Sequence, residues 1–341
     1  MRVSSDDVTI VMQGKIVEHK LIDVQAINNI RKVKKHFPKS KIIISSWKMA
    51  PELQLQFNKL ARYLGVSYLL NDDPGVTCKI EGGIKYVSNI NRMIVSSLNG
   101  IRLAKTTFVI KMRTDSYFTS DAVLALLENS VVNDRFKREG GYSVFNHRVL
   151  NYNLFSRNAR GYLPYLFHPG DILFCGYKDD VMSIFNIDLA DESIFKVSKY
   201  AHFYTTMDYV PEQYVWVKCI EKIKGMTVFH GNGQRENRLV IESEIYYISN
   251  FIPFNSSDMA FCWRKHKSHY HCKGKYSVYD YSDWIRLYNK YILGLSTPVD
   301  REFALKFVVN CFMIGYFYLR SNLLRIPFVK RTALKIFNKR G

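Results

Sequence analysis

Apolar residues follow two different patterns over the first third of the chain. Short apolar runs begin at Val8 and Phe108 and occupy residues 42–44 and 66–70, as expected for buried strands. Between these runs, apolar residues return at helical spacing in three groups: Ala26, Ile30, Val33 and Phe37; Leu53, Phe57, Leu60 and Leu64; Ile90, Ile94, Leu98 and Ile101. The two patterns predict the order β-α-β-α-β-loop-α-β over residues 8–115.

Residues that favour helix ends lie at the borders of the predicted helices. Asp23 is a suitable N-cap for the first helix, and Pro38 ends it. Pro51 suits the first turn of the second helix, and Gly65 its end. Asn89 begins the third helix. This alternation is typical of an α/β fold with a mostly parallel sheet flanked by helices.

The second half of the chain is less regular. We predict strands from Gly141, over Ile172 to Cys175 and from Met226 to His230, and a helix from Pro211 to about Lys222. Residues 151–165, rich in Asn, Arg and Tyr, have the composition of a loop.

The composition changes near residue 240. From about Glu242 onward aromatic and basic residues dominate, and no acid follows Glu302. Basic side chains interleaved with apolar ones suit the anionic face of a bilayer. We therefore expect a first domain over residues 1–240 and a C-terminal helical, aromatic and basic extension over residues 241–341 with membrane-contacting helices. The alternative is a core-packing helix with a solvated basic end.

The longest apolar run covers residues 307–319. It holds 13 residues, whereas a membrane-spanning helix needs roughly 20. We expect this segment to lie at an interface or in the core.

The whole chain is strongly basic. Lys and Arg number 49 against 30 Asp and Glu, which gives a formal net charge of +19. Such a charge favours an anionic membrane, nucleic acid or a phosphate-bearing substrate, but no recognisable nucleic-acid motif accompanies it and no nucleic acid is expected. The six cysteines include no CxxC pair, and the first ten residues are too charged for a signal peptide. We expect a cytoplasmic protein with reduced thiols.

Polar residues follow each predicted strand of the first third. They are Gln13-Gly14, Ser46 to Lys48, Asp72-Asp73 and Arg113 to Asp115. Ligands of parallel sheets bind beyond the carboxyl ends of the strands. The four exits therefore predict one binding site on a common edge of the sheet.

The segment NINRMIVSSLNGIRLAKTTFVIKMRTD, residues 89–115, carries a family resemblance. It is similar to the middle of nucleotide-sugar glycosyltransferases of the GT-A fold, in which such a helix leads into an apolar strand that ends in Asp-x-Asp. More closely, the chain resembles the WavE lipopolysaccharide-synthesis family of proposed glycosyltransferases. The matching pieces follow one another over about residues 8–220: VTIVMQGKI, HFP with KIIISSWK, NDDPG, NINRMIVSSLNG, KMRTD and PEQYVW.

The resemblance implies a GT-A-like, Rossmann-like fold and a glycosyl transfer. A sugar would pass from a nucleotide-sugar donor to a lipid-linked surface glycan, such as a lipopolysaccharide core or a related polysaccharide. The enzyme would work in the cytoplasm, peripheral to the inner membrane. The chain departs from the family pattern at Arg113, which stands where the first motif carboxylate is expected, and only Asp115 remains.

Arg113 and Asp115 are the central candidates for donor binding. Asp115 could hold Mg²⁺ or Mn²⁺, and Arg113 could bind a phosphate through two hydrogen bonds. Because one motif carboxylate is missing, the need for Mn or Mg stays open. The alternative for both residues is a strand-end ion pair or a turn cap.

Six further residues are candidates for the nucleotide-sugar site. They are Gln13 and Gly14, where the backbone could approach a base or ribose; Asp73, as an acceptor; Trp47, as a stacking surface; and Asn91 and Arg92, near a helix N-terminus. Ordinary tight turns, a covered sheet end and helix capping are the alternatives.

Asp171 and Glu212 are candidates for the general base, because a carboxylate can accept the proton of the acceptor hydroxyl. Glu212 is slightly favoured, since PEQYVW belongs to the resemblance. An acid in the first turn of a helix is also common for dipole reasons alone. His230, at a predicted strand end, could join Asp115 on a metal, because related folds sometimes place a late histidine there. A structural histidine is the alternative.

Other interpretations of the sequence were weighed against these candidates. CWRKHKSHYHC, residues 262–272, holds zinc-type donors but no standard spacing, so a basic loop that faces phosphate or acidic glycan is preferred. The chain as a whole could also be a non-catalytic α/β protein that binds a polyanion or glycan through its charge. A dinucleotide-binding enzyme is disfavoured, because no GxGxxG follows the first strand.

Overall fold

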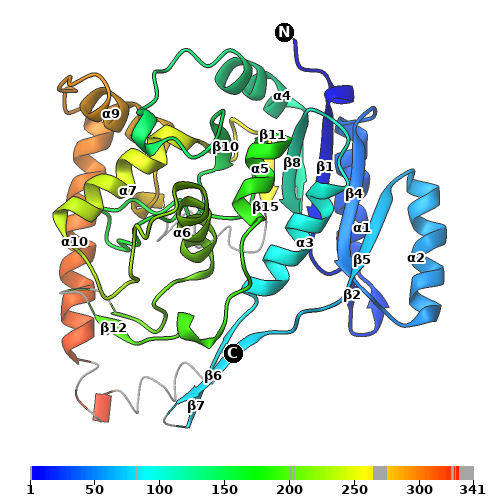
Figure 1. Cartoon of the computed structure of the whole chain (residues 1–341), viewed down its shortest axis with the longest axis horizontal. Coiled ribbons are helices and arrows are strands. Elements are labelled where there is room, and N and C mark those ends of the chain that lie inside the picture. The colour runs from blue at the N-terminus through cyan, green and yellow to red at the C-terminus, as the bar shows by residue number, and fades with distance from the viewer. Residues whose placement is uncertain are drawn as a thin grey trace.

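A seven-stranded sheet runs through the molecule in the order β14-β10-β11-β8-β1-β4-β5 (Figure 1). The structure is a computed structural model that describes residues 2–81, 83–199, 202, 204–263, 275–323, 326 and 328–329. The strands are β1 Val8–Gln13, β2 Val17–Glu18, β3 Leu21–Ile22, β4 Lys41–Trp47, β5 Ser67–Asn71, β6 Thr77–Glu81, β7 Ile84–Ser88, β8 Phe108–Arg113, β9 Ser116–Phe118, β10 Val149–Tyr152, β11 Phe174–Tyr177, β12 Ser198–Lys199, β13 Tyr204–Thr205, β14 Phe251–Phe254 and β15 Phe261–Trp263.

Helices account for most of the rest of the described chain. They are α1 Val24–His36, α2 Pro51–Leu64, α3 Ile90–Arg102, α4 Ala122–Leu127, α5 Lys178–Phe185, α6 Pro211–Lys224, α7 Asn237–Asn250, α9 Tyr281–Tyr291 and α10 Arg301–Leu323. Short helical turns lie at η1 Ser5–Asp7, η2 Glu128–Val132, η3 Gly140–Tyr142, η4 Glu192–Ile194 and η6 Lys275–Ser277.

The N-terminal half of the sheet is parallel. β1 lies between β4 and β8 and pairs in parallel with both, and β5 extends the sheet beyond β4. Every side chain of β1 is buried, as expected for a strand covered on both faces. The predicted alternation over residues 8–115 is confirmed, and so is the mostly parallel α/β architecture.

The other half of the sheet is mixed. β11 pairs antiparallel with β8 and with β10, and β14 joins β10 in parallel. β14 lies beyond residue 240, so the sheet includes residues from both sides of the domain boundary proposed from composition.

Helix α3 covers the parallel half of the sheet and contacts β1, β4, β5 and β8 (Figure 1). Its contact with β1 is close at Gly100, where an added Cβ would lie 2.5 Å from Cγ1 of Val11. α5 packs on β8 and β11, and α2 lies beside β5. Asp23 accepts a hydrogen bond from the amide of Gln25, and Gly65 ends α2 in the left-handed conformation, as their residue types predict.

Several expectations for the less regular regions are wrong. The segment from Gly141 forms a helical turn and loop, and the strand begins only at Val149. Residues 226–230 form no strand. The hairpin β6–β7 and the helices α5 and α7 were not predicted. These elements have mixed polar and apolar patterns, and tertiary contacts decide their structure.

α10 is longer than its apolar run suggested. It has 23 residues, and it lies on the far side of the molecule from α2 (Figure 1). Among the described residues it is the one helix with the length and composition to cross a membrane. The apolar run therefore understated the length of the helix. Because only 11% of its apolar window is buried, α10 does not lie in the core, and the other expected position, at an interface, stays a prediction.

Candidate active site

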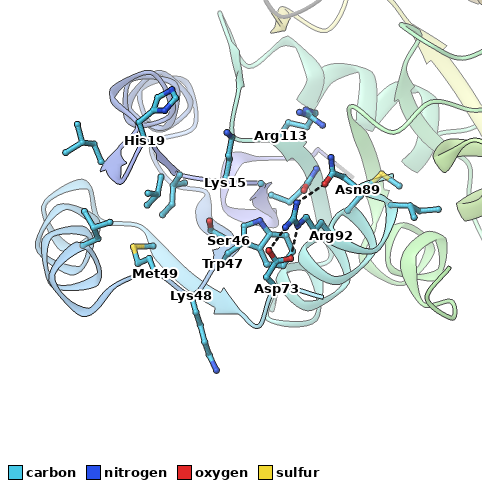
Figure 2. A pocket seen from close by; sticks show the side chains of 18 of the residues that line it. Lys15, His19, Ser46, Trp47, Lys48, Met49, Asp73, Asn89, Arg92 and Arg113 are labelled. Atoms are coloured by element: carbon cyan, nitrogen blue, oxygen red, sulfur yellow. Dashed lines mark hydrogen bonds and ion pairs between the residues drawn. The ribbon is translucent and has the colours of Figure 1, made fainter. Parts of the chain in front are cut away.

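A large cavity opens where the parallel strands end, and we call it the strand-exit cavity (Figure 2). Its volume is about 1420 Å³, above the 300–1,000 Å³ typical of small-ligand pockets. It is lined by the exits of β1, β4 and β8, by the loop after β5 and by the β2–β3 hairpin. The first turns of α2, α3 and α6 also line it, together with Asp171 and Trp263. Of the predicted site residues, Gln13, Gly14, Trp47, Asp73, Arg92, Arg113, Asp171 and Glu212 line this cavity.

The exits of β1 and β8 are tightly joined. Thr114 donates from its hydroxyl to the carbonyl of Lys15 at 3.0 Å, and an added Cβ at Gly14 would approach the same hydroxyl at 2.9 Å. Gly14 also has a φ of +129°, which glycine tolerates best. The glycine therefore lets the two strand exits meet at the cavity. Gln13 accepts a hydrogen bond from Ser96 on α3, so its side-chain oxygen is already engaged.

Asp73 and Arg92 form an ion pair on the cavity wall (Figure 2). The guanidinium of Arg92 donates from Nε and Nη2 to the two carboxylate oxygens at 2.7 and 2.6 Å. These hydrogen bonds hold the pKa of Asp73 below its usual range. Arg92 also donates to the side chain of Asn89 at 2.8 Å. Asp73 thus orients a cation that a phosphate could contact.

Asn91 does not line the strand-exit cavity. Its amide donates to the hydroxyl of Thr77 and to the carbonyl of Ala190, and its oxygen accepts from the amide of Ala190. These contacts fasten α3 to β6 and to a distant loop. The residues of this turn that line the cavity are Asn89, the N-cap position of α3, together with Ile90, Arg92 and Met93.

Arg113 and Asp115 form a two-bond pair at the exit of β8. Nε and Nη2 of Arg113 each donate to one oxygen of Asp115 at 2.9 Å. Burial alone would lower the pKa of Arg113, but the hydrogen bonds to Asp115 and the nearby carboxylates more than offset it, and the pKa is raised. The guanidinium lies 5.3 Å from the ring of Trp263. Arg113 lines the cavity, whereas Asp115 does not line it and holds the guanidinium of Arg113 in place.

Asp171 and Glu212 bring two carboxylates to the same cavity. Glu212 lies in the first turn of α6, and Asp171 in the loop before β11. Burial, and then the negative charge of Asp171, raise the pKa of Glu212 to about 7, while Arg157 and Arg113 oppose this shift. A carboxylate with a raised pKa is a stronger base, which suits it to accept a proton near neutral pH.

Two further buried residues, His168 and Arg157, influence Glu212. Nε2 of His168 is 3.6 Å from the carboxylate of Glu212. Burial, reinforced by the charge of Arg157, lowers the pKa of His168 to about 3, so the imidazole is neutral and this contact is not an ion pair at neutral pH. Arg157 is 8% exposed and donates to the hydroxyl of Ser277 at 2.8 Å. The sequence analysis missed both residues.

Lys111 is fully buried in the middle of β8, next to the motif. Its Nζ donates to the backbone carbonyl of Asp171, and burial lowers its pKa to about 8, against the charge of Asp171. The hydrogen bond ties the loop that carries Asp171 to β8. A lysine within an apolar strand, two residues before Arg113, was the sequence signal for this role.

The candidate metal ligands are not gathered into a preformed cluster in the described part of the chain. Among the described residues, no group of three or more His, Cys, Asp or Glu side chains converges. Both carboxylate oxygens of Asp115 accept from Arg113, and His230 is exposed and does not line the strand-exit cavity. The requirement for Mn or Mg stays a prediction. The zinc-type segment lies mostly outside the described residues, which exclude 264–274.

Basic side chains line the cavity beyond those predicted. Lys15 and Lys20 belong to the loop and hairpin after β1, together with His19, and Lys48 follows β4 (Figure 2). Lys15 and Arg113 come from neighbouring strand exits, since Gln13 is paired with Arg113 across β1 and β8. The sequence signal was present in GKIVEHK, but this segment contains no motif.

Three solved structures resemble the chain in overall outline. They are galactosyltransferase LgtC in complex with donor and acceptor sugar analogs (10% identity, 87% of this chain, 99% of that chain, TM-score 0.39), a cytidylyltransferase from Leptospira borgpetersenii (10%, 86%, 98%, 0.37) and mouse xyloside xylosyltransferase 1 in its apo form (6%, 73%, 85%, 0.33). All three TM-scores are below 0.5, which indicates only a distant likeness in outline.

The sequence comparisons give a clearer result. No curated protein matches the chain. The pattern of one family matches residues 8–313, which is most of the chain and includes every residue named above as lining the strand-exit cavity. The chain belongs to the WavE lipopolysaccharide synthesis family.

Proposed function

We propose that this protein is a glycosyltransferase that moves a sugar from a nucleotide-sugar donor to a lipid-linked surface glycan. One observation carries the proposal: a carboxylate pair and oriented arginines line the same cavity at the exits of parallel strands. Membership of a family of lipopolysaccharide synthesis supports it.

The donor nucleotide would lie across the strand exits. Arg113 and Arg92 are each held by a carboxylate, Asp115 and Asp73, so they need little reorganisation to bind an anionic phosphate. Trp47 offers an aromatic face on the same wall. The charge that develops on the leaving phosphate is then stabilised by cations fixed in advance.

The acceptor would be activated by the carboxylate pair. Glu212 accepts the proton of the acceptor hydroxyl as the oxygen forms its bond to the anomeric carbon of the sugar. The bond between that carbon and the phosphate oxygen breaks, and its electron pair leaves with the nucleotide. Asp171 is the alternative base. With Glu212 as the base, burial and the negative charge of Asp171 keep the pKa of Glu212 high.

A lipid-linked acceptor would place the enzyme at the cytoplasmic surface of the inner membrane. The net charge of +19 supports this location, since such a surface carries anionic lipids. Most of the basic tail after α10 lies outside the described residues.

The proposal is tested with purified protein and a panel of nucleotide sugars, in the presence of Mn²⁺ or of EDTA. We expect at least one donor to raise the melting temperature and to be hydrolysed slowly or transferred. Glu212→Gln should keep the thermal shift and lose the turnover. If no donor binds in either condition while anionic polymers bind with a steep salt dependence, the non-catalytic polyanion-binding alternative is correct instead.

A further inference from the structure

Helix α10 shows an inverted distribution of polar and apolar residues. Its two buried side chains are polar, Lys306 at 6% exposure and Asn310 at 7%. Large apolar side chains point outward, with Phe307 at 62%, Phe312 at 75% and Leu319 at 64% exposure. A helix that packs against the core of a water-soluble protein has the opposite arrangement, with its apolar side chains buried.

Lys306 fastens the first part of α10 to α9. Its Nζ donates to the carbonyl of Val278 at 2.8 Å, to Asp280 at 3.0 Å and to Asp283. The three charged groups are largely buried, so this contact is a fixed anchor and not a fluctuating surface ion pair.

Asn310 and Phe317 fasten the middle of the helix. The side-chain oxygen of Asn310 accepts from the amide of Tyr162 at 2.8 Å, and its amide donates to the carbonyl of Tyr276 at 2.8 Å. The ring of Phe317 stacks on that of Tyr162, with centroids 5.8 Å apart. The same side of α10 therefore contacts the body of the protein from Lys306 to Phe317.

We propose that α10 lies in the plane of an anionic bilayer, with its outward apolar face embedded at the boundary of headgroups and acyl chains. Phe307, Val308, Phe312, Tyr316 and Leu319 form this face. The inference rests on the proposed function in one respect only, since a lipid-linked acceptor requires an enzyme held at the membrane.

The body contacts argue against a spanning helix. The length of 23 residues would suffice. However, crossing would draw the side chains packed on α10, including Asp280 and Asp283, toward the hydrocarbon core, where charged groups are strongly disfavoured. An in-plane helix keeps these groups on the protein side and places only the apolar face in lipid.

Charge favours lipid over a second copy of the chain as the occupant of this face. The net charge is +19, and no acid follows Glu302. Two copies that met through α10 would bring like charges together, whereas phosphate headgroups would neutralise them.

Two native thiols provide the reporters for a test. Cys311 is exposed on α10, and Cys78 is exposed on the β6–β7 hairpin, so the second is a matched control. Both reporter variants have Cys262 and Cys272 replaced by Ser. One variant also lacks Cys78 and keeps Cys311; the other lacks Cys311 and keeps Cys78. The buried Cys175 and Cys219 are kept. An environment-sensitive fluorophore is attached to the remaining exposed thiol.

With vesicles of phosphatidylglycerol and phosphatidylcholine, we expect a blue shift for the probe at Cys311 and none at Cys78. Quenchers near the headgroups should quench the Cys311 probe more than quenchers at the bilayer centre. Phe312→Glu should weaken vesicle binding at least about tenfold, whereas Tyr63→Glu, at an equally exposed position on α2, should not.

Three results would overturn the inference: a Cys311 probe that stays in water, stronger quenching from the bilayer centre, or protection of Cys311 by self-association without lipid. Hydrolysis of a soluble donor is measured in parallel for the reporter proteins and for Phe312→Glu.

If the reporter proteins insert into vesicles but no donor is used, the proposed function is refuted and the membrane inference stands. If donor use is normal but no insertion is seen, the membrane inference is refuted and the proposed function stands.

Discussion

At the exit of β8, the guanidinium of Arg113 donates two hydrogen bonds to Asp115 and lines the strand-exit cavity. A guanidinium has five N–H donors, so donors remain for a phosphate. The carboxylate that a metal would need instead orients the cation. At the residue scale, Asp115 therefore supports and orients Arg113.

Arg113→Ala should weaken use of the nucleotide-sugar donor. A hydrogen-bonded charged contact contributes about 1.5–3 kcal/mol, so we expect kcat/KM for the donor to fall about 10- to 150-fold, measured by steady-state transfer or hydrolysis. Arg113→Lys should retain part of the activity, because the charge stays but the paired geometry is lost. Arg62→Ala, on the exposed surface of α2, is the control. Equal activity of Arg113→Ala and the control would show that the pair is only a turn cap.

The pH profile should report the carboxylate pair. A base must be ionised to work, and the pKa of Glu212 is raised to about 7. Activity should therefore rise with pH through a midpoint near 7 instead of near the ordinary value for glutamate. Asp171→Asn removes a negative charge, so the midpoint should move to lower pH. Glu212→Gln should lower kcat by about 10²-fold or more.

If Asp171→Asn abolishes the rising limb and Glu212→Gln preserves it, the roles of the two carboxylates are reversed. The thermal shift with donor, measured for both variants, separates this outcome from misfolding.

At the scale of elements, helix α3 positions the site because it lies close to β1 and β4. Gly100 allows this approach: an added Cβ would meet Cγ1 of Val11 at 2.5 Å and Cβ of Ser45 at 3.0 Å. The N-terminal turn of the same helix brings Asn89 and Arg92 to the strand-exit cavity. A change in helix–sheet spacing would move the cation on the cavity wall.

Gly100→Ala should destabilise the protein by about 1–3 kcal/mol, since the added methyl overpacks the interface between α3 and the sheet. Gly315→Ala in α10 is a matched control, because nothing lies within 4 Å of its added Cβ. There alanine should leave stability unchanged or raise it by about 0.5–1 kcal/mol. Thermal or denaturant unfolding measures both. If Gly315→Ala lowered the free energy of unfolding as much as Gly100→Ala does, the packing explanation would be contradicted.

At the scale of the whole molecule, a buried charge cluster holds the C-terminal helices together. Burial would raise the pKa of Asp280, but Lys306 and local hydrogen bonds outweigh it and the pKa is lowered. Asp283 is more buried, and there desolvation outweighs Lys306, so its pKa is raised. Lys306 thus outweighs the cost of burial at Asp280 but not at Asp283.

Lys306→Met should destabilise the attachment of α10 by about 3–5 kcal/mol, because it leaves the buried carboxyl group of Asp283 and the partly buried one of Asp280 without their cation. The loss should be largest at neutral pH and smaller in acid, where these groups become protonated. Adding Asp283→Asn should restore part of the stability by removing one uncompensated charge. The readout is the unfolding free energy of single and double variants against pH. A double variant no more stable than Lys306→Met would contradict this account.

Local residue patterns were sufficient for the elements of the parallel half. The apolar run from Val8, the N-cap at Asp23 and the left-handed Gly65 each have a local cause, so β1, α1 and the end of α2 are where expected. Parallel strands also place their ends on one edge, which explains why Gln13, Trp47 and Arg113 share a cavity. Sequence alone was sufficient for these features because strand and helix periods are local properties.

Distant contacts decided the rest. Asn91 looked like a ligand contact but bonds to Ala190, 99 positions away, and His168 and Arg157 reach Glu212 only through the fold. The outward apolar face of α10 could not be assigned either, because composition does not tell which side of a helix meets the protein. The order of residues along the chain was enough to predict the family, the α/β class and the polar strand exits. Which side chains are already paired, which are buried and which face the cavity became clear only from the folded molecule, because these features depend on residues far apart in the chain.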